Sequence, residues 1–229
     1  QPESEETTSN SVKALNIIRS NAILGHTADK KAYARLKDST VIPVDSKEMR
    51  ELLLYLFNQD YQQTLSNSAM NEAIGTASAI ACHEGPEWKI GVRCSREDSL
   101  LEIDLYEGEY RVRIKPDSAS VIPISESDFL FRRPSDSLPL TLPSDMNDPQ
   151  SALSGLDLLK QHINLEDSDN YPLLLAAILY SIYGERGFPI VALVGATGSG
   201  KSEAARVIRA LVDPNKSPLG SIASSDREA

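Results

Sequence analysis

The spacing of hydrophobic residues predicts helices and short strands in the first third of the chain. Residues 1–12 are polar, acidic and without periodicity, which is typical of a disordered lead-in. From Ser46 apolar residues recur at helical spacing as far as Phe57, and a second helix is predicted at 68–82. This mixture predicts an α+β domain. Three β-prone runs precede the helices, at 22–26, 33–36 and 40–44.

From Trp88 onward the period of the pattern changes to two. Such alternation predicts an antiparallel meander with one buried face, on which Trp88 is a core residue rather than a base-stacking platform. Glu102 and Asp104 are then expected on the solvent face of the middle strand. The three alternating runs are 88–94, 101–105 and 110–114.

Five cationic residues share the outward positions around these runs, and two interpretations of them stay open. If the strands run in sequence order, Glu102 and Asp104 lie between two cationic strands and pair with them across the sheet. Alternatively, the cations form a surface for a nucleic-acid backbone. The cations are Lys89, Arg93, Arg111, Arg113 and Lys115.

Proline and serine residues interrupt these patterns between 116 and 149, so an extended connector is expected there. Within it, Arg132 and Arg133 are expected to be solvated, with docking of the connector, a subunit contact or a DNA contact as alternatives. Helices are predicted at 155–163 and 171–183. The second is apolar on nearly every face and is therefore expected to be buried.

The most specific motif follows a continuous apolar run at 190–194, which is typical of a parallel strand covered on both faces. The eight residues after this run fit the phosphate-binding pattern G-x-x-x-x-G-K-[ST] at every fixed position. Its glycines let backbone N–H groups converge on phosphate oxygens, and the helix that follows points its positive end at the same place. The predicted nucleotide site consists of Gly195, Ala196, Thr197, Gly198, Ser199, Gly200, Lys201 and Ser202.

Two side chains of this loop have specific roles in the predicted site. Lys201 is expected to reach the β- and γ-phosphates of ATP, and the Ser202 hydroxyl is expected to complete the shell of a Mg²⁺ ion. The helix after the loop is expected to turn Arg206 and Arg209 outward. Its residues expected to face a sheet are Ala205, Ile208, Leu211 and Val212.

Hydrolysis needs more than a phosphate-binding loop. An acid at the end of a later strand must hold the Mg²⁺ shell and position water. The acidic run at 100–104 precedes the loop and alternates outward, so no catalytic residue is assigned in this chain. The catalytic acid is expected beyond Ala229, in a longer protein, and the chain by itself is expected to be inactive.

These patterns together predict an α+β N-terminal domain with an antiparallel meander, followed by the truncated start of a P-loop α/β domain. The expected organisation is a lead-in at 1–12, a small α+β domain at 13–125, a Pro-rich connector at 126–150, and a helical lead-in with the N-terminal part of a P-loop ATPase domain at 151–229.

Composition limits the other classes of function. The net charge of −10 argues against non-specific nucleic-acid binding by the whole surface, although it leaves room for a local basic patch. The longest apolar run, 172–183, is too short to span a bilayer, so no membrane segment is expected. Cys82 and Cys94 form no CxxC pair and are interpreted as core residues of a cytoplasmic protein. Three histidines lack ligand or triad spacing and are interpreted as structural: His26, His83 and His162.

A series of short motifs over residues 120–229 is more specific than the loop alone, above all Phe131-Arg132-Arg133 and Leu211-Val212-Asp213-Pro214-Asn215. The others are Leu138-Pro139-Leu140, Ile163-Asn164, the apolar helix at 173–179, Phe188-Pro189-Ile190, Pro218-Leu219 and Asp226-Arg227-Glu228. With the loop, they resemble ATP-binding proteins of phages and integrated mobile elements, described as helicase-like or primase-associated replication ATPases. The resemblance implies an ATPase module that assembles into a ring and moves along DNA.

Three functions are therefore compatible with the sequence. The first is the ATP-binding portion of a helicase-like or translocase ATPase in phage or mobile-element replication, with single- or double-stranded DNA and further copies of the chain as partners. The second is an interaction module, in which the meander binds DNA or a partner beside an incomplete nucleotide domain. The third is a P-loop enzyme of another class, such as a small-molecule kinase, although many of those kinases begin with the loop itself.

Overall fold

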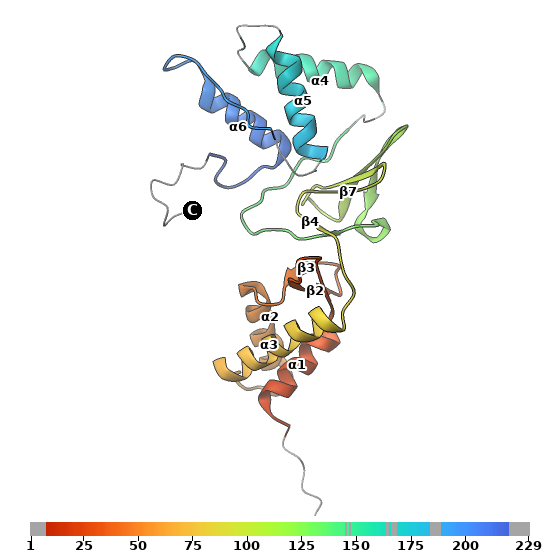
Figure 1. The fold of residues 1–229 in the computed structure, drawn as a ribbon, viewed down its shortest axis with the longest axis vertical. Helices are drawn as coiled ribbons and strands as arrows, with labels where there is room; N and C mark the ends of the chain where they lie inside the picture. Colours follow the sequence, from red (N-terminus) through yellow and green to blue (C-terminus); the bar gives the residue numbers. More distant parts are fainter. Residues whose placement is uncertain are drawn as a thin grey trace, which may run out of the picture. The chain divides into compact units, whose positions relative to one another are not determined.

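The computed structural model describes residues 8–144, 146, 148–163, 165, 169–183 and 189–219. They form an α+β structure with antiparallel sheets, as the sequence predicted in general terms (Figure 1). The chain divides into a first unit, Gln1–Gly91 with Asp128–Arg133, and a second unit, Val92–Ser127 with Pro134–Ala229. In this division the meander belongs with the C-terminal helices. No helix in the described ranges has the length and apolar character needed to cross a membrane.

Three serine residues start the three helices of the first unit. The hydroxyls of Ser9, Ser46 and Ser66 each accept a hydrogen bond from the backbone N–H three residues later, and so satisfy a donor that the helix itself leaves free. The sequence predicted the last two helices but missed the first, which begins within the expected lead-in; residues 1–7 of that lead-in lie outside the described residues. The helices are α1 (Asn10–Asn21), α2 (Lys47–Tyr61) and α3 (Asn67–His83).

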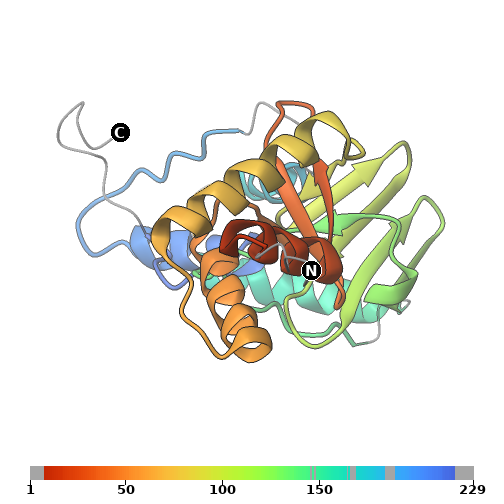
Figure 2. The same ribbon diagram turned by 90° about the horizontal axis from the view of Figure 1, so that it is seen from below.

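An antiparallel sheet supports these helices. α1 and α3 pack on the sheet and on each other, and α2 packs on α1 (Figure 2). Their shared core contains Ile17, Leu53, Phe57 and Ala77, all almost completely buried, so apolar burial stabilises this unit. The strands, in spatial and sequence order, are β1 (Ala22–His26), β2 (Ala32–Leu36) and β3 (Val41–Pro43).

Trp88 packs against the backbone of β1. Its backbone N–H donates a hydrogen bond to the carbonyl of His26 at 2.6 Å, and a Cβ added to Gly25 would lie 2.7 Å from the Trp88 ring. The half-buried ring thus occupies the space that a side chain at Gly25 would need. The chain then forms β4 (Ile90–Gly91), which pairs in parallel with β9 (Leu130–Phe131).

Replacing Gly25 with alanine is expected to destabilise the protein by about 1–3 kcal/mol, because the methyl group must displace a packed indole ring. Gly75→Ala is the matched control, since a Cβ at this exposed position of α3 meets nothing within 4 Å. This control should gain roughly 0.5–1 kcal/mol from helix propensity. Urea unfolding of both variants measures the difference, and equal effects of the two would contradict the close contact with Trp88.

The second unit contains the predicted meander, with two corrections to its strands. The first strand begins at Cys94 rather than at Trp88, and a fourth strand forms in the stretch expected to be an extended connector. Pro123 is tolerated there because this strand lies at the edge of the sheet. The antiparallel strands are β5 (Cys94–Glu97), β6 (Leu100–Asp104), β7 (Tyr110–Lys115) and β8 (Ser118–Pro123), in that order.

The expected solvent face of the meander is buried. Glu102 and Asp104 are both 0% exposed, so their outward placement was wrong. The predicted cross-strand pairing is confirmed on one side, since Glu102 lies opposite Arg113 and Asp104 opposite Arg111 in the ladder between β6 and β7. On the other side, Glu102 lies opposite Ser95 of β5 rather than a cation. The chain after β8 folds back over this polar face, where Ser127 donates a hydrogen bond to Glu102. Because this polar face is covered, the sheet buries charged residues on one face and apolar residues on the other.

Arg113 makes the best-defined of these charge pairs. Its Nε and Nη2 atoms donate to one Glu102 oxygen at 2.9 and 2.6 Å, and Nη2 also donates to the carbonyl of Glu126 at 2.7 Å. Because Glu102 has no contact with water, the two hydrogen bonds and the opposite charge compensate its desolvation.

Removing the Glu102 carboxylate is expected to cost far more stability than removing an exposed one. Glu102→Ala should lower the free energy of unfolding by about 3–5 kcal/mol, since it leaves a largely buried cation without its counter-charge. Glu203→Ala breaks the exposed pair with Arg206 and should change stability by less than about 1 kcal/mol. Thermal and urea unfolding compare the two, and a Glu102→Ala loss as small as the Glu203→Ala loss would show that the buried pair stabilises nothing.

The helices of the second unit share a small core in which Leu174, Ile178 and Ala204 are buried. The middle helix was expected to be buried on all sides, but Leu173 and Leu179 are exposed, because within the described residues only one of its faces is covered. The first helix begins earlier than predicted, where the Asp148 carboxylate accepts hydrogen bonds from two backbone N–H groups. These helices are α4 (Pro149–His162), α5 (Asn170–Tyr183) and α6 (Lys201–Val212), and a short 3₁₀ turn, η1 (Ile124–Glu126), follows β8.

Candidate phosphate-binding site

The predicted loop leads directly into the N-terminus of α6. Gly198 and Gly200 have φ values of 82° and 83°, in the left-handed region that side-chain-bearing residues rarely adopt. Nothing lies within 4 Å of a Cβ added at either position, so the backbone angle rather than space requires glycine there. Gly198 is a variable position of the motif, and its conformational role was not visible from the pattern.

The Lys201 side chain folds back across the loop. Its ammonium donates hydrogen bonds to the carbonyls of Gly195 and Ala196 at 2.8 and 2.7 Å, and to the Ser199 hydroxyl at 3.3 Å. A positive charge is thereby held inside the loop, beside the N-terminal end of a 12-residue helix whose first N–H groups have no partner within the helix. The ammonium, bonded to two loop carbonyls, and the N-terminal end of α6 thus lie side by side.

The residues before the loop do not form the predicted parallel strand. Residues 190–194 belong to no strand, and Ile190 and Val194 are 96% and 93% exposed. Only Leu193 packs against the core shared by α5 and α6. A parallel strand needs hydrogen-bonded neighbours, and no described strand lies beside this run. The prediction of a strand covered on both faces was therefore wrong for the described residues.

The inner face of α6 also differs from the predicted one. Ala204 is its buried residue, Val207 and Ile208 are half-buried, and Leu211 is exposed. The helix lies beside α5 rather than on a sheet (Figure 1). The outward orientation predicted for Arg206 and Arg209 is confirmed by their exposure.

At the other end of α6, Asp213 joins the helix to the meander. One of its carboxylate oxygens accepts from Arg93 Nε at 3.1 Å, and the other accepts from Arg209 Nη2 at 3.0 Å. Arg93 also donates to the carbonyls of Asp104 and Leu138, at 3.2 and 2.8 Å. Arg93 is 6% exposed, so its predicted outward position was wrong.

The chain after Asp213 lies along the connector. Leu138 N–H donates to the carbonyl of Pro214 at 2.8 Å, and Lys216 N–H donates to that of Asp136 at 2.9 Å. The Asn215 amide donates to the Asp136 carboxylate at 3.0 Å, which holds the pKa of Asp136 below its usual value. The motif around Asp213-Pro214-Asn215 thus has a structural role that its sequence alone did not reveal.

The other sequence candidates do not assemble into a site. Arg111 is buried beside Asp104, so the cations of the meander do not share one exposed surface. His26 is buried, and its Nδ1 and Nε2 atoms lie 3.0 Å from the Thr27 carbonyl and 3.2 Å from Lys30 Nζ. Within the described ranges, no group of three or more His, Cys, Asp or Glu side chains could hold a metal ion.

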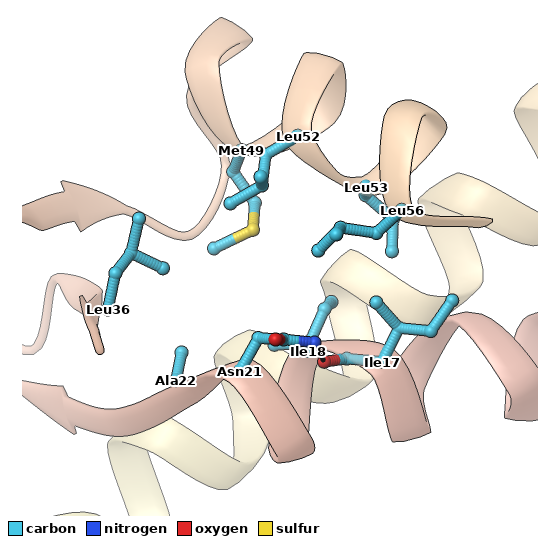
Figure 3. A pocket seen from close by; sticks show the side chains of 9 residues that line it. All are labelled: Ile17, Ile18, Asn21, Ala22, Leu36, Met49, Leu52, Leu53 and Leu56. Atoms are coloured by element: carbon cyan, nitrogen blue, oxygen red, sulfur yellow. Dashed lines mark hydrogen bonds between the residues drawn. The ribbon is translucent and has the colours of Figure 1, made fainter. Parts of the chain in front are cut away.

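A small apolar groove opens between α1 and α2 in the first unit (Figure 3). Ile17, Met49 and Leu53 are among its walls, and Asn21 lies at its edge. The Asn21 amide donates to the carbonyl of Ile17 and its oxygen accepts from Lys37, so its polar atoms are already used. The groove contains no acid, base or nucleophile, and we assign no chemistry to it.

Burial keeps the thiol of Cys94 protonated. Desolvation raises its pKa to about 12, and burial likewise raises the pKa of Tyr106 to about 12. Both side chains are therefore neutral at pH 7, and Cys94 is no nucleophile there.

Comparison of the chain with protein-family models, with curated proteins and with solved structures found no match.

The Cys94 thiol should resist iodoacetamide at pH 8 in the native protein and react only after unfolding. Its raised pKa contributes stability that is complete below the unfolded value of 9.0 and is lost as the pH rises toward about 12. The loss is at most about 1.4 kcal/mol per pH unit. Cys94→Ala, which lacks this titration, is the control in urea unfolding between pH 8 and 11; parallel pH profiles would contradict the shift.

Proposed function

We propose that the chain binds the phosphates of ATP at Gly195–Ser202, as the ATP-binding portion of a helicase-like or translocase ATPase. The observation that carries this proposal is the position of the Lys201 ammonium, which lies inside the loop at the N-terminus of α6. Bound phosphate oxygens would replace the two carbonyls as its partners. The left-handed glycines of the loop support the same interpretation, because they turn the backbone sharply just before the helix.

Mg²⁺ fits the chemistry of the residues present. Ser202 lies exposed in the first turn of α6, next to Lys201, and supplies one hydroxyl oxygen. Mg²⁺ commonly takes few protein ligands and completes its octahedron with water and phosphate oxygens. When bound, the ion would neutralise phosphate charge. We propose binding rather than hydrolysis for these residues, since no acid that could position water is assigned among them.

The resemblance to replication ATPases of phages and mobile elements supports DNA as the partner of this ATPase and a ring of identical subunits as its assembly. The buried positions of Arg93 and Arg111 disfavour the alternative in which the meander itself is the DNA-binding surface. A P-loop enzyme of another class remains the competing proposal, and the response of the chain to DNA distinguishes the two.

Lys201→Ala should weaken Mg-ATP binding at least about tenfold, because the charge-assisted hydrogen bonds to phosphate are lost. Isothermal titration calorimetry on the full chain measures the affinity. Lys115→Ala, at the exposed end of β7, is the matched control and should bind like the wild type. Equal affinities of Lys201→Ala and the wild type, or no binding by the wild type, would refute the nucleotide site.

Two further titrations resolve the details of the site. Ser202→Ala should lose the contribution of Mg²⁺ to affinity while keeping the affinity for ATP measured in EDTA. Adding single- or double-stranded DNA should raise ATP affinity if the chain belongs to a DNA-dependent ATPase. Nucleotide binding that no DNA alters would favour the other class of P-loop enzyme.

A further inference from the structure

α6 is a rigid link between two parts of the second unit. Its 12 residues span about 18 Å, from the loop at Lys201 to the anchored end at Asp213. Apolar packing holds one face of the helix, on which Ala204 is buried and Val207, Ile208 and Val212 are half-buried. The polar contacts at its C-terminal end add a directional constraint on where its N-terminus, and with it the loop, is placed.

Asp213 stands where helix electrostatics alone disfavours an acid. It follows the last residue of α6, at the negative end of the helix dipole, where cations rather than carboxylates stabilise. Arg209 and Arg93 each donate to one of its two oxygens and so compensate this charge. An acid at this end of the helix does not stabilise the helix itself. Its presence is better explained by the ion pair that it makes with Arg93 across the unit.

Arg93 connects this carboxylate to three other features of the unit. Its remaining donors bind the carbonyls of Asp104 in β6 and Leu138 in the connector. Its guanidinium lies 3.9 Å from the centre of the Tyr106 ring. Any movement of Asp213 would therefore disturb a buried cation whose partners belong to the meander and the connector.

We infer that Arg93 and Asp213 are positioning residues for the phosphate-binding loop, so that nucleotide at one end of α6 and the meander at the other stabilise each other. The inference rests on the proposed nucleotide binding. Thermodynamic linkage makes the effect reciprocal. The free energy by which the Arg93–Asp213 pair strengthens nucleotide binding equals the free energy by which bound nucleotide stabilises the pair.

Hydrogen exchange of the wild-type chain tests the linkage without any variant. Mg-ATP should slow amide exchange at 195–204, where it binds, and also at 100–105 and 136–140, which it does not touch. Protection confined to 195–204 would overturn the inference while leaving the nucleotide site intact. If Mg-ATP protects no segment, the proposed function itself fails.

Asp213→Asn tests the pair directly, since it keeps the shape of the side chain and removes its charge. Mg-ATP affinity should fall about 5- to 50-fold, and protection at 100–105 should be lost while that at 195–204 remains. Asp157→Asn removes the same charge from an exposed position of α4 and should change neither. Asp213→Glu, which restores the charge, should recover part of the affinity.

A merely structural role for Asp213 would give a different result. Asp213→Asn would then lower the melting temperature, yet nucleotide affinity would stay within twofold of the wild type, and that outcome would overturn the inference. Lys201→Ala, run in parallel at a Mg-ATP concentration close to the wild-type Kd, should lose most of the nucleotide-dependent protection. If it does not, the nucleotide binds elsewhere and the proposed function fails before the role of Asp213 is in question.

Discussion

The second unit depends on one buried cation, the guanidinium of Arg93. Its donors bind an oxygen from β6, one from the connector and one from the residue that follows α6. A charge with so little exposure is stable only when such partners are held in place around it. Each of the three segments is therefore constrained by the other two, although they are far apart in the sequence.

The same requirement extends across the polar face of the meander. Glu102 is stabilised by Arg113 on the next strand and by Ser127 after β8. A shift of the β6–β7 register by one residue would break this pair and turn the charges toward the opposite face. Apolar residues could pack there with less desolvation cost, so we interpret the buried charges as a device that selects one register.

The loop and the meander are linked by a short helix whose apolar contacts lie on the face shared with α5. This arrangement gives the proposed nucleotide site a physical route to the rest of the unit, because the polar anchors of α6 lie at the end opposite the loop. Affinity for phosphate and stability of the meander would then share one set of contacts. The run at 190–194 takes no part in these polar contacts. Of its residues, Leu193 packs against the apolar core shared by α5 and α6, whereas Ile190 and Val194 are exposed.

The sequence by itself determined the features that local chemistry controls. Apolar spacing predicted α2 and α3, and the glycine-lysine pattern predicted the loop followed by α6. Period-two alternation predicted the meander and the partners of Glu102 and Asp104. Alternation separates two faces of a sheet but does not say what covers each, so only the tertiary structure decided that these carboxylates are buried. Likewise, residues 190–194 can form a strand only beside hydrogen-bonded neighbours, which the sequence does not specify. The roles of Arg93 and Asp213 depend on partners distant in the sequence, and these contacts exist only after the chain has folded.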